Sequence, residues 1–458
     1  MNEHTTSSLW FQEALLPGGW ADAVRIDIVG GRIAGIAPGA APLPGEARHG
    51  VALPGLANLH SHAFQRGMAG LAERRGPADD NFWTWREVMY RFLDRLDPDD
   101  IQAIAELAFA EMLETGFTRV GEFHYLHNDP AGRPYANPAT LAERIAAAAA
   151  ETGIALTLLP VFYAHSSFGG APASPGQRRF LSDPDGFAAL VEGARRAVSG
   201  LDDPVVGVAP HSLRAVTPDE LAVILPLAGS GPIHIHAAEQ VKEVEDCLAW
   251  SGQRPVEWLL DHAGIDRRWC LVHATHMTPD ETDRLAASGA VAGLCPITEA
   301  NLGDGLFPTP EFLAAGGQLG LGTDSNILID AAAELRALEY GQRLARRGRN
   351  LLARAEGQSV GATLFGAALA GGAQALGLPD SGLAVGAAAD IVSLDLDHPS
   401  LTGRRGDALL DGWIFAGRTG MVDTVWRFGR VVVQHGRHRD ADRIGARYRQ
   451  VLARILAS

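Results

Sequence analysis

Two pairs of histidines occur with a single residue between the members of each pair. His60 and His62 end one short apolar run, and His234 and His236 end another. Residues i and i+2 of a β-strand point to the same face, so both members of a pair can be directed toward one bound group. Neutral imidazoles are common metal ligands. This pattern predicts a metal site built from His60, His62 and His236. His234 lies farther from its strand end and is expected to pack in the core.

Two further residues of ligand or catalytic type follow later apolar runs. His273 lies in CLVHATH and Asp324 in GLGTDSN. Capping of a helix N-terminus is the alternative interpretation of Asp324. His276, three residues beyond His273, is expected to be a surface or loop histidine.

The predicted ligand set combines three neutral imidazoles with one carboxylate, the latter from Asp324. This set suits one Zn²⁺ ion with an open coordination position, which lowers the pKa of a bound water and makes hydroxide available near neutral pH. Iron fits the same ligand types.

The elements that must position these residues alternate between apolar runs and amphipathic helical segments. From residue 52 to 380 the alternation predicts an α/β fold, a (β/α)8 TIM-like barrel. At about 30 residues per βα unit, the candidate residues fall on strands 1, 5, 6 and 8, whose carboxyl ends share one barrel mouth. One predicted helix, DPDDIQAIAELAFAEMLETG, has Asp97 as its cap and Gly116 at its end. The predicted strands cover residues 53–60, 117–125, 154–163, 205–211, 232–237, 270–274, 290–296 and 318–324.

The two ends of the chain show a different pattern. AVRIDIVGGRIAGIAPG alternates apolar and polar residues around a Gly-Gly turn, and similar segments return in AVGAAADIVSLDL and MVDTVWRFGRVVVQHG. We therefore expect residues 1–51 and 381–458 to form a small β-sandwich domain with a C-terminal helix, and residues 52–380 to form the barrel.

Composition limits the partners and the compartment. With 458 residues, 47% of them hydrophobic, the chain can bury a large core, and its net charge of −15 disfavours nucleic acid and anionic membranes. Three cysteines without CxxC spacing and a start without an apolar export segment predict a cytoplasmic protein. A homodimer is the expected assembly.

One stretch, residues 357–379, carries no charge and imitates a membrane span. Ala and Gly dominate it, and it lacks the density of Leu, Ile and Val that favours insertion. We interpret it as a closely packed helix of a soluble protein.

Several motifs together resemble the amidohydrolase superfamily. They are PGLANLHSH after an N-terminal β segment, HIHAAE, the strand-6 histidine, GLGTDS and AADIVSLD. Some members hold two metals bridged by a lysine on strand 4, but the only lysine here, Lys242, follows strand 5, so a single metal is expected. The resemblance also implies that Glu239, in HIHAAE, shuttles a proton as in mononuclear deaminases. The alternative for Glu239 is an acidic residue in the first turn of a helix.

The loops at the predicted mouth carry arginines, which suggest an anionic substrate. Arginine binds carboxylates through a planar fork of donors. LHSHAFQRGMAG, FWTWREVMY, GEFHYLHN, APHSLRAV, HIHAAEQVKEVEDC, CPITEANLGDG and GLGTDSN resemble the formimidoylglutamate deiminase family. That resemblance implies hydrolysis of the dicarboxylate N-formimino-L-glutamate to N-formyl-L-glutamate and ammonia in histidine degradation. It also implies substrate binding by Gln65, Arg86, Tyr125, His211 and Arg214.

The same resemblance gives roles to two strand-end residues. His273 would orient or stabilise the attacking oxygen, and Asp324 would be a metal ligand that can also accept a proton. Arg86 as a surface charge and Tyr125 as a core aromatic are the alternatives at those positions.

Two other functions stay open at this point. A deaminase of aromatic bases such as guanine is favoured if Arg86 and Arg214 point away from the metal. A metal-free binding protein with the same fold would require lost ligands, whereas this sequence keeps all four.

Overall fold

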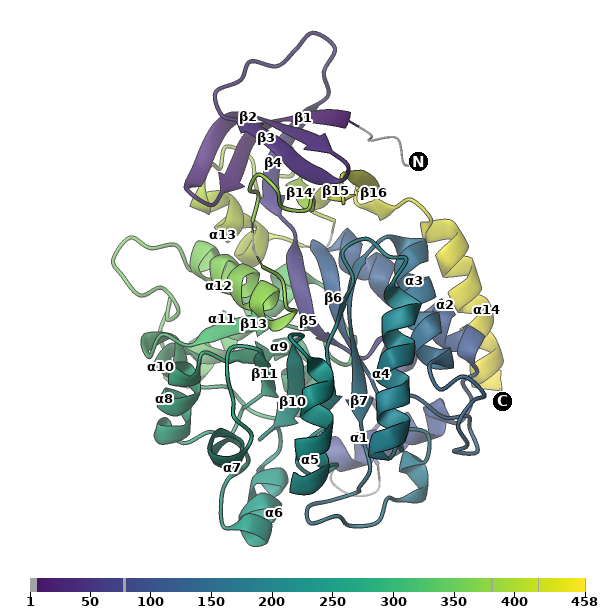
Figure 1. The fold of residues 1–458 in the computed structure, drawn as a ribbon. Coiled ribbons are helices and arrows are strands. Elements are labelled where there is room, and N and C mark those ends of the chain that lie inside the picture. Colours follow the sequence, from purple (N-terminus) through teal and green to yellow (C-terminus); the bar gives the residue numbers. More distant parts are fainter. Residues whose placement is uncertain (1–5, 77–79, 380–381, 419, 458) are drawn as a thin grey trace.

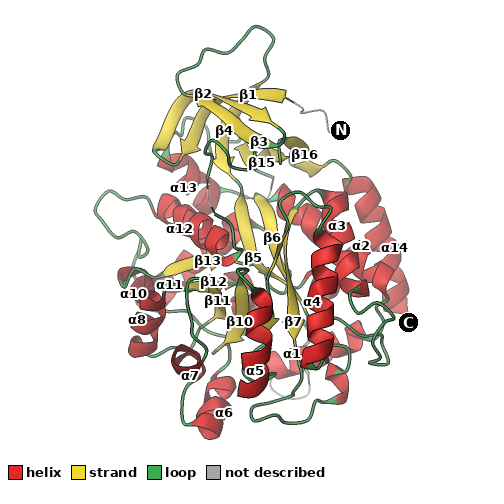
Figure 2. Cartoon of the chain, in the orientation of Figure 1, coloured by secondary structure: helices red, strands yellow, loops and turns green. Residues whose placement is uncertain are grey.

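The fold is described from a computed structural model that covers residues 6–76, 80–379, 382–418 and 420–457. The expected domain boundary at 380/381 falls outside these ranges. A (β/α)8 barrel forms the larger part, with its strands enclosed by helices (Figure 2). Its strands are β5 (Leu56–Ser61), β6 (Phe117–His124), β7 (Ala155–Phe162), β8 (Val205–Val206) with β9 (Ala209–Pro210), β10 (Ile233–Ala237), β11 (Trp269–His273), β12 (Val291–Leu294) and β13 (Gln318–Leu321).

The predicted barrel is confirmed, and its strands pair in parallel in two groups. One group has the order β5-β6-β7-β8, with β9 also on β7, and the other has the order β10-β11-β12-β13. Isolated bridges connect the groups, Val208 to Ile233 and Ser212 to His236 at one junction and Ser61 to Asp324 at the other. Every residue of β6 and β7 is buried, as expected for parallel strands covered by helices.

Helices and short 3-10 turns connect and cover the strands. In α2, Asp97 accepts a hydrogen bond from the Asp100 N–H, Pro98 is the first residue, and Gly116 follows the end with φ +103°. The helices are α1 (Phe82–Leu93), α2 (Pro98–Glu114), α3 (Thr140–Thr152), α4 (Pro184–Val198), α5 (Pro218–Ile224), α6 (Val241–Ser251), α7 (Pro255–His262), α8 (Pro279–Ser288), α9 (Pro296–Leu302), α10 (Thr309–Ala314), α11 (Ala331–Arg346) and α12 (Val360–Ala375). The 3-10 turns are η1 (Ala63–Met68), η2 (Pro175–Gln177) and η3 (Leu225–Ala228).

Strands from both chain ends form the predicted small β domain, and the barrel strands point away from it (Figure 1). Its eight strands follow the hydrogen-bonded order β17-β16-β15-β14-β4-β1-β2-β3, in which the strands of the two chain ends form two sheets that share β4. The path is continuous because β4 pairs with β1 on one edge and with β14 on the other. The elements are β1 (Thr6–Leu16), β2 (Gly19–Val29), β3 (Arg32–Ala37), β4 (Arg48–Pro54), β14 (Ile391–Leu394), β15 (Val422–Arg427), β16 (Arg430–Gln434), β17 (Arg437–His438), α13 (Asp407–Ala416) and α14 (Ala441–Ala457).

Two details of this domain follow from the sequence. Gly30 and Gly31 both have positive φ, +58° and +80°, as the turn between β2 and β3 requires. The C-terminal helix α14 lies along α2 of the barrel (Figure 1), where Arg447 forms an ion pair with the buried Glu106.

The uncharged stretch 357–379 contains α12, which packs against β5, β12 and β13. No helix in the described ranges is long and apolar enough to cross a membrane. A Cβ atom on Gly371 would lie 1.9 Å from the carbonyl oxygen of Leu319, so the small residues allow the helix to approach the strand backbone.

We expect Gly371→Ala to lower the midpoint of thermal unfolding, because the added methyl group meets fixed backbone and overpacking costs about 1–3 kcal/mol. Gly366→Ala in the same helix is the matched control. A Cβ there meets nothing within 4 Å, so this change should raise stability by about 0.5–1 kcal/mol. Equal midpoints for the two variants would contradict the proposed close approach.

Candidate metal centre and active site

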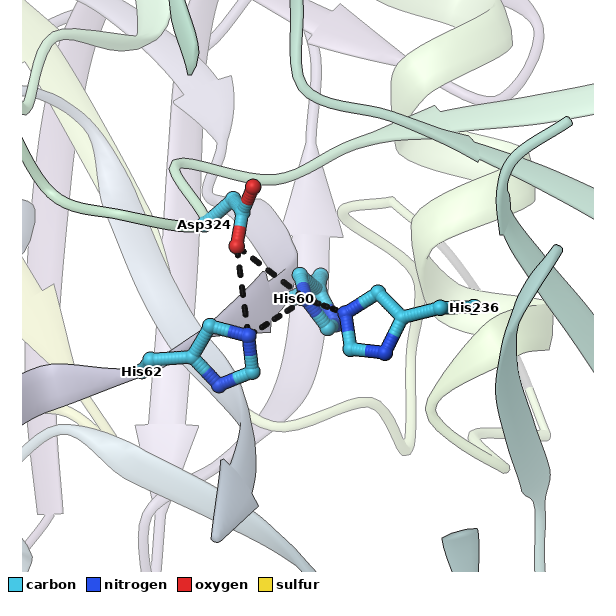
Figure 3. Close-up of side chains that lie close together, drawn as sticks. All are labelled: His60, His62, His236 and Asp324. Carbon is cyan, nitrogen blue, oxygen red and sulfur yellow. Dashed lines mark hydrogen bonds and ion pairs between the residues drawn. The ribbon is translucent and has the colours of Figure 1, made fainter. Parts of the chain in front are cut away.

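Four side chains meet at the carboxyl end of the barrel strands (Figure 3). His60 and Ser61 are the last two residues of β5, and His62 follows that strand. His236 lies in β10, and Asp324 follows β13. The Nε2 atom of His60 lies 3.2 Å from that of His62 and 3.1 Å from that of His236. Asp324 Oδ1 lies 3.4 Å from His60 Nε2 and 3.2 Å from His62 Nε2. Ligands about 2.0–2.2 Å from a tetrahedral zinc lie about 3.3–3.5 Å apart, so this spacing fits one ion.

The hydrogen bonds of the histidines leave their lone pairs facing one another. Nδ1 of His62 donates to the Phe123 carbonyl at 2.9 Å, and Nδ1 of His236 donates to the His211 carbonyl at 3.0 Å. Their Nε2 atoms are therefore bare acceptors that converge with Nε2 of His60. Burial lowers the pKa of all three ligand histidines, which keeps them neutral. A cation satisfies this arrangement, as metal ligation requires neutral imidazoles.

A second group of ligand types, His273, Cys295 and Asp324, shares one residue with the first. Burial raises the pKa of the Cys295 thiol well above its ordinary value. Because the thiolate is the form that binds metals, the first group is the better candidate.

Glu239 and His273 lie beside the candidate ligands. Glu239 Oε1 is 3.6 Å from His273 Nε2, and Asp324 Oδ2 is 3.8 Å from the same nitrogen. Burial raises the pKa of Glu239, whereas His273 and Arg214 favour its carboxylate form. Glu239 precedes α6, whose N-cap is Gln240, so it is not the first-turn residue of that helix.

Backbone strain accompanies these positions. Ala238, His273 and Asp324, at the ends of strands β10, β11 and β13, have φ values of +50°, +67° and +43°. Non-glycine residues adopt this conformation only where the surroundings hold it, and such positions cluster at functional sites.

The candidate metal centre opens into a pocket whose lining combines aromatic side chains with a few polar and charged groups, as is usual for small-molecule sites. All five residues proposed from sequence to bind substrate line this pocket, together with His62, His236, Glu239 and Asp324. They are Gln65, Arg86, Tyr125, His211 and Arg214.

Two arginines of the pocket have no carboxylate partner. Neither Arg86 nor Arg214 forms an ion pair with any residue of the described ranges, and the buried Nε of each has no hydrogen-bond partner there. The Trp83 ring lies 4.6 Å from the Arg86 guanidinium carbon and 5.6 Å from that of Arg214. Two unpaired guanidinium groups beside one aromatic ring form a cationic wall that an anion can neutralise.

The other three pocket residues carry complementary polar groups. Gln65 Nε2 donates to the Tyr125 hydroxyl at 2.8 Å, while Gln65 Oε1 is buried without a hydrogen-bond partner among the described residues. Burial lowers the pKa of His211, so its ring is neutral. The pocket therefore offers both acceptors and donors in addition to the arginines.

The other histidines considered above and the lysine, which are not candidate metal ligands, lie where the sequence suggested. His234 is fully buried and contacts the Ala375 carbonyl at 2.7 Å, in the core. His276 lies on the loop after β11 and is half-buried. Lys242 is exposed on α6 and pairs with Asp246 at 2.7 Å, so no lysine lies near the ligands.

Several residues of the site were not found from the sequence. Phe82, Met89 and Tyr90 recur at helical spacing around Arg86 in α1, a signal that could have grouped them with it, whereas Tyr163 and Phe180 carry none. Glu299 accepts a hydrogen bond from Cys295 N–H at 2.9 Å and lies 3.2 Å from His273 Nδ1. Glu243 accepts the N–H groups of Ala238 and Glu239, each at 3.2 Å.

Comparisons with known proteins agree with this geometry. The amidohydrolase family model matches residues 51–432, and the model of the N-terminal domain of formimidoylglutamate deiminase HutF matches residues 7–50. A formimidoylglutamate deiminase of Pseudomonas aeruginosa is 52% identical over 452 residues, which cover 98% of this chain and 100% of the relative.

Solved structures give the same fold. An amidohydrolase from Brucella melitensis is 57% identical with a TM-score of 0.96, covering 99% of this chain and 100% of that one. An adenosine deaminase from Xanthomonas campestris with bound zinc superposes with a TM-score of 0.81 at 22% identity, covering 98% of each chain. The chain therefore belongs to the amidohydrolase family, within the branch that contains the formimidoylglutamate deiminases.

Proposed function

We propose that the protein hydrolyses N-formimino-L-glutamate to N-formyl-L-glutamate and ammonia, a step of histidine degradation. The observation that carries this proposal is the pair of unpaired arginines in a pocket that opens onto the candidate metal centre. A dicarboxylate matches two guanidinium groups, whereas a neutral base would leave both without a partner. The formimidoylglutamate deiminase relative, 52% identical, supports the same substrate.

The proposed ligands are His60, His62, His236 and Asp324, and they would hold one divalent cation. We propose Zn²⁺, because three neutral imidazoles and a carboxylate suit it and a structural relative contains zinc. When bound, the cation supplies Lewis-acid activation of the attacking water.

The chemistry requires two proton transfers, since both protons of the water end on the nitrogen that leaves. We propose that Glu239 accepts the first proton and returns it to this nitrogen, and that Asp324 accepts the second, which then passes to the same nitrogen. His273 Nε2, within 4 Å of both carboxylates, stabilises the attacking oxygen. A C–O bond forms, the C–N bond breaks, and the formyl carbonyl remains as ammonia departs.

The substrate would lie with its carboxylates against Arg86 and Arg214 and its formimino group toward the metal centre. Tyr125 and His211, whose ring centroids lie 5.8 Å apart in the same pocket lining, would supply further polar contacts. Gln65 Oε1, buried and without a hydrogen-bond partner in the described part of the chain, is available to accept a substrate N–H.

The test is ammonia release from N-formimino-L-glutamate, guanine and adenine, measured side by side with the same preparation. We expect turnover of N-formimino-L-glutamate alone. Turnover of guanine or adenine alone would favour the aromatic-base deaminase. A binding protein would be favoured if the preparation contains no metal, turns over none of the three compounds and is not activated by a divalent ion.

Metal removal is expected to abolish turnover and lower thermal stability. Neutral histidine lone pairs that face one another at 3.1–3.2 Å lose their common partner when the ion leaves. Dialysis against a chelator, metal analysis, and re-addition of one equivalent of Zn²⁺ measure both effects. Full activity at less than about 5% metal occupancy would contradict the proposed centre.

We further propose that the enzyme works in the cytoplasm as a homodimer, without nucleic-acid or membrane partners. The net charge of −15 supports the absence of these partners, and the three free cysteines support the compartment. We also propose that residues 1–51 and 381–458 together form one domain and that residues 52–380 form the other. Light scattering coupled to size-exclusion chromatography tests the assembly.

A further inference from the structure

The barrel closes between β5 and β13, and the candidate ligands lie on both sides of this junction. In backbone pairing, β13 joins β5 through a single bridge, Ser61 to Asp324. The bridge consists of two backbone hydrogen bonds, Asp324 N to His60 O and His62 N to Asp324 O, each at 3.0 Å, and Thr323 N also donates to His60 O at 3.1 Å. The relative placement of the ligands therefore depends on a short contact.

A chain of buried side chains crosses the same junction. Asn58 Nδ2 donates to Thr323 Oγ1 at 2.7 Å, and Thr323 Oγ1 donates to Asn326 Oδ1 at 2.6 Å. Asn326 Nδ2 then donates to Ser61 Oγ at 3.1 Å, and the Thr323 N–H donates to Asn58 Oδ1 at 3.0 Å. All four residues have no exposed surface. A buried network this fully paired fixes one arrangement of its members.

The network ends on the backbone of two candidate ligands. Asn326 Nδ2 lies 3.1 Å from the carbonyl oxygen of His62 and 3.2 Å from that of Asp324. Asp324 and Asn326 both have left-handed backbones, with φ of +43° and +54°. Such conformations persist only where the surroundings impose them, and here the surroundings are the Asn326 amide and Thr323 hydroxyl.

We propose that Asn326 and Thr323 are positioning residues that set the angle between His62 and Asp324 at the metal. Asn326 binds both ligand carbonyls at once, and Thr323 fixes the orientation of its amide group. The inference rests on the metal centre proposed above. Outer partners that orient metal ligands change metal affinity by about 10- to 100-fold when removed.

Titration of the metal-free protein with Co²⁺ tests this proposal, read by visible absorption and by competition with a chelator. Thr323→Val removes the hydroxyl at constant shape, and Thr323→Ser restores it. Thr157→Val is the matched control, since Thr157 is a fully buried barrel residue whose hydroxyl donates to the Leu376 carbonyl at 3.2 Å, away from the ligands. Asn326→Ala is the second test variant. Thermal unfolding without metal shows whether each variant folds.

We expect folded Thr323→Val and Asn326→Ala to bind Co²⁺ about 10- to 100-fold more weakly, with shifted absorption bands that report altered ligand geometry. Thr323→Ser and Thr157→Val should match the unmodified protein in both readouts. Unchanged affinity and bands in a folded Thr323→Val or Asn326→Ala protein would overturn the proposal. So would failure of both to fold while Thr157→Val folds, because the network would then act on folding alone.

The unmodified protein separates this result from the proposed function. If it binds no Co²⁺ with the bands of histidine ligation, the metal centre itself is wrong. If it binds Co²⁺ normally and the variants bind equally well, only the positioning role fails.

Discussion

Glu239→Gln is expected to lower kcat for N-formimino-L-glutamate by about 10²- to 10⁴-fold while the protein keeps its metal and fold. The amide has nearly the shape of the carboxylate but cannot carry a proton between water and the leaving nitrogen. Glu239 is buried, and its carboxylate lies 3.6 Å from His273 Nε2, beside the candidate ligands. Ammonia release and metal content, measured on the same preparation, test this expectation.

Glu245→Gln is the matched control, because Glu245 is an exposed glutamate on α6, close in sequence to Glu239. It should keep the activity of the unmodified protein. Near-normal kcat in a metal-replete Glu239→Gln protein would remove Glu239 from the proton transfers. His273→Asn should also lose turnover, since His273 is held between Glu239 and Glu299 at the same place.

Much of the fold followed from the sequence because buried parallel strands are short apolar runs. Each run in the middle of the chain became a barrel strand, and the histidines at two run ends meet at one mouth. Strand periodicity places His60 and His62 on one face, so their proximity needed no tertiary information. The residues at the end of a strand are therefore the most predictable part of the site.

Other parts depend on tertiary contacts that no local pattern encodes. The continuous strand order of the small domain arises because β4 pairs on both edges, which alternation of polar and apolar residues cannot specify. The Trp83 ring lies beside the guanidinium groups of both Arg86, on the same helix, and Arg214. Because Arg214 lies 128 positions from Arg86 along the chain, only the packing of α1 over the mouth brings these groups together. Glu299 approaches His273 from α9 in the same way.

If the two arginines bind the substrate carboxylates as proposed above, their removal is expected to have a large effect on specificity. Arg86→Met and Arg214→Met keep much of the packing of the stem and delete the charge. Each should leave one buried substrate carboxylate unpaired and cost about 2–5 kcal/mol in kcat/KM, or about 30- to 5,000-fold. Arg91→Met, at an exposed position of the same helix as Arg86, is the matched control and should change little.

Substrate analogues that lack one carboxylate assign each arginine to its partner. The unmodified protein should hydrolyse each analogue poorly. A variant without the matching arginine should lose little further activity on that analogue, because the interaction is already absent, whereas the other variant should lose activity again. Normal hydrolysis of N-formimino-L-glutamate by both Arg86→Met and Arg214→Met would contradict the anion site. The unpaired guanidinium groups beside Trp83 would then have no role in substrate choice, and only a general deaminase would remain.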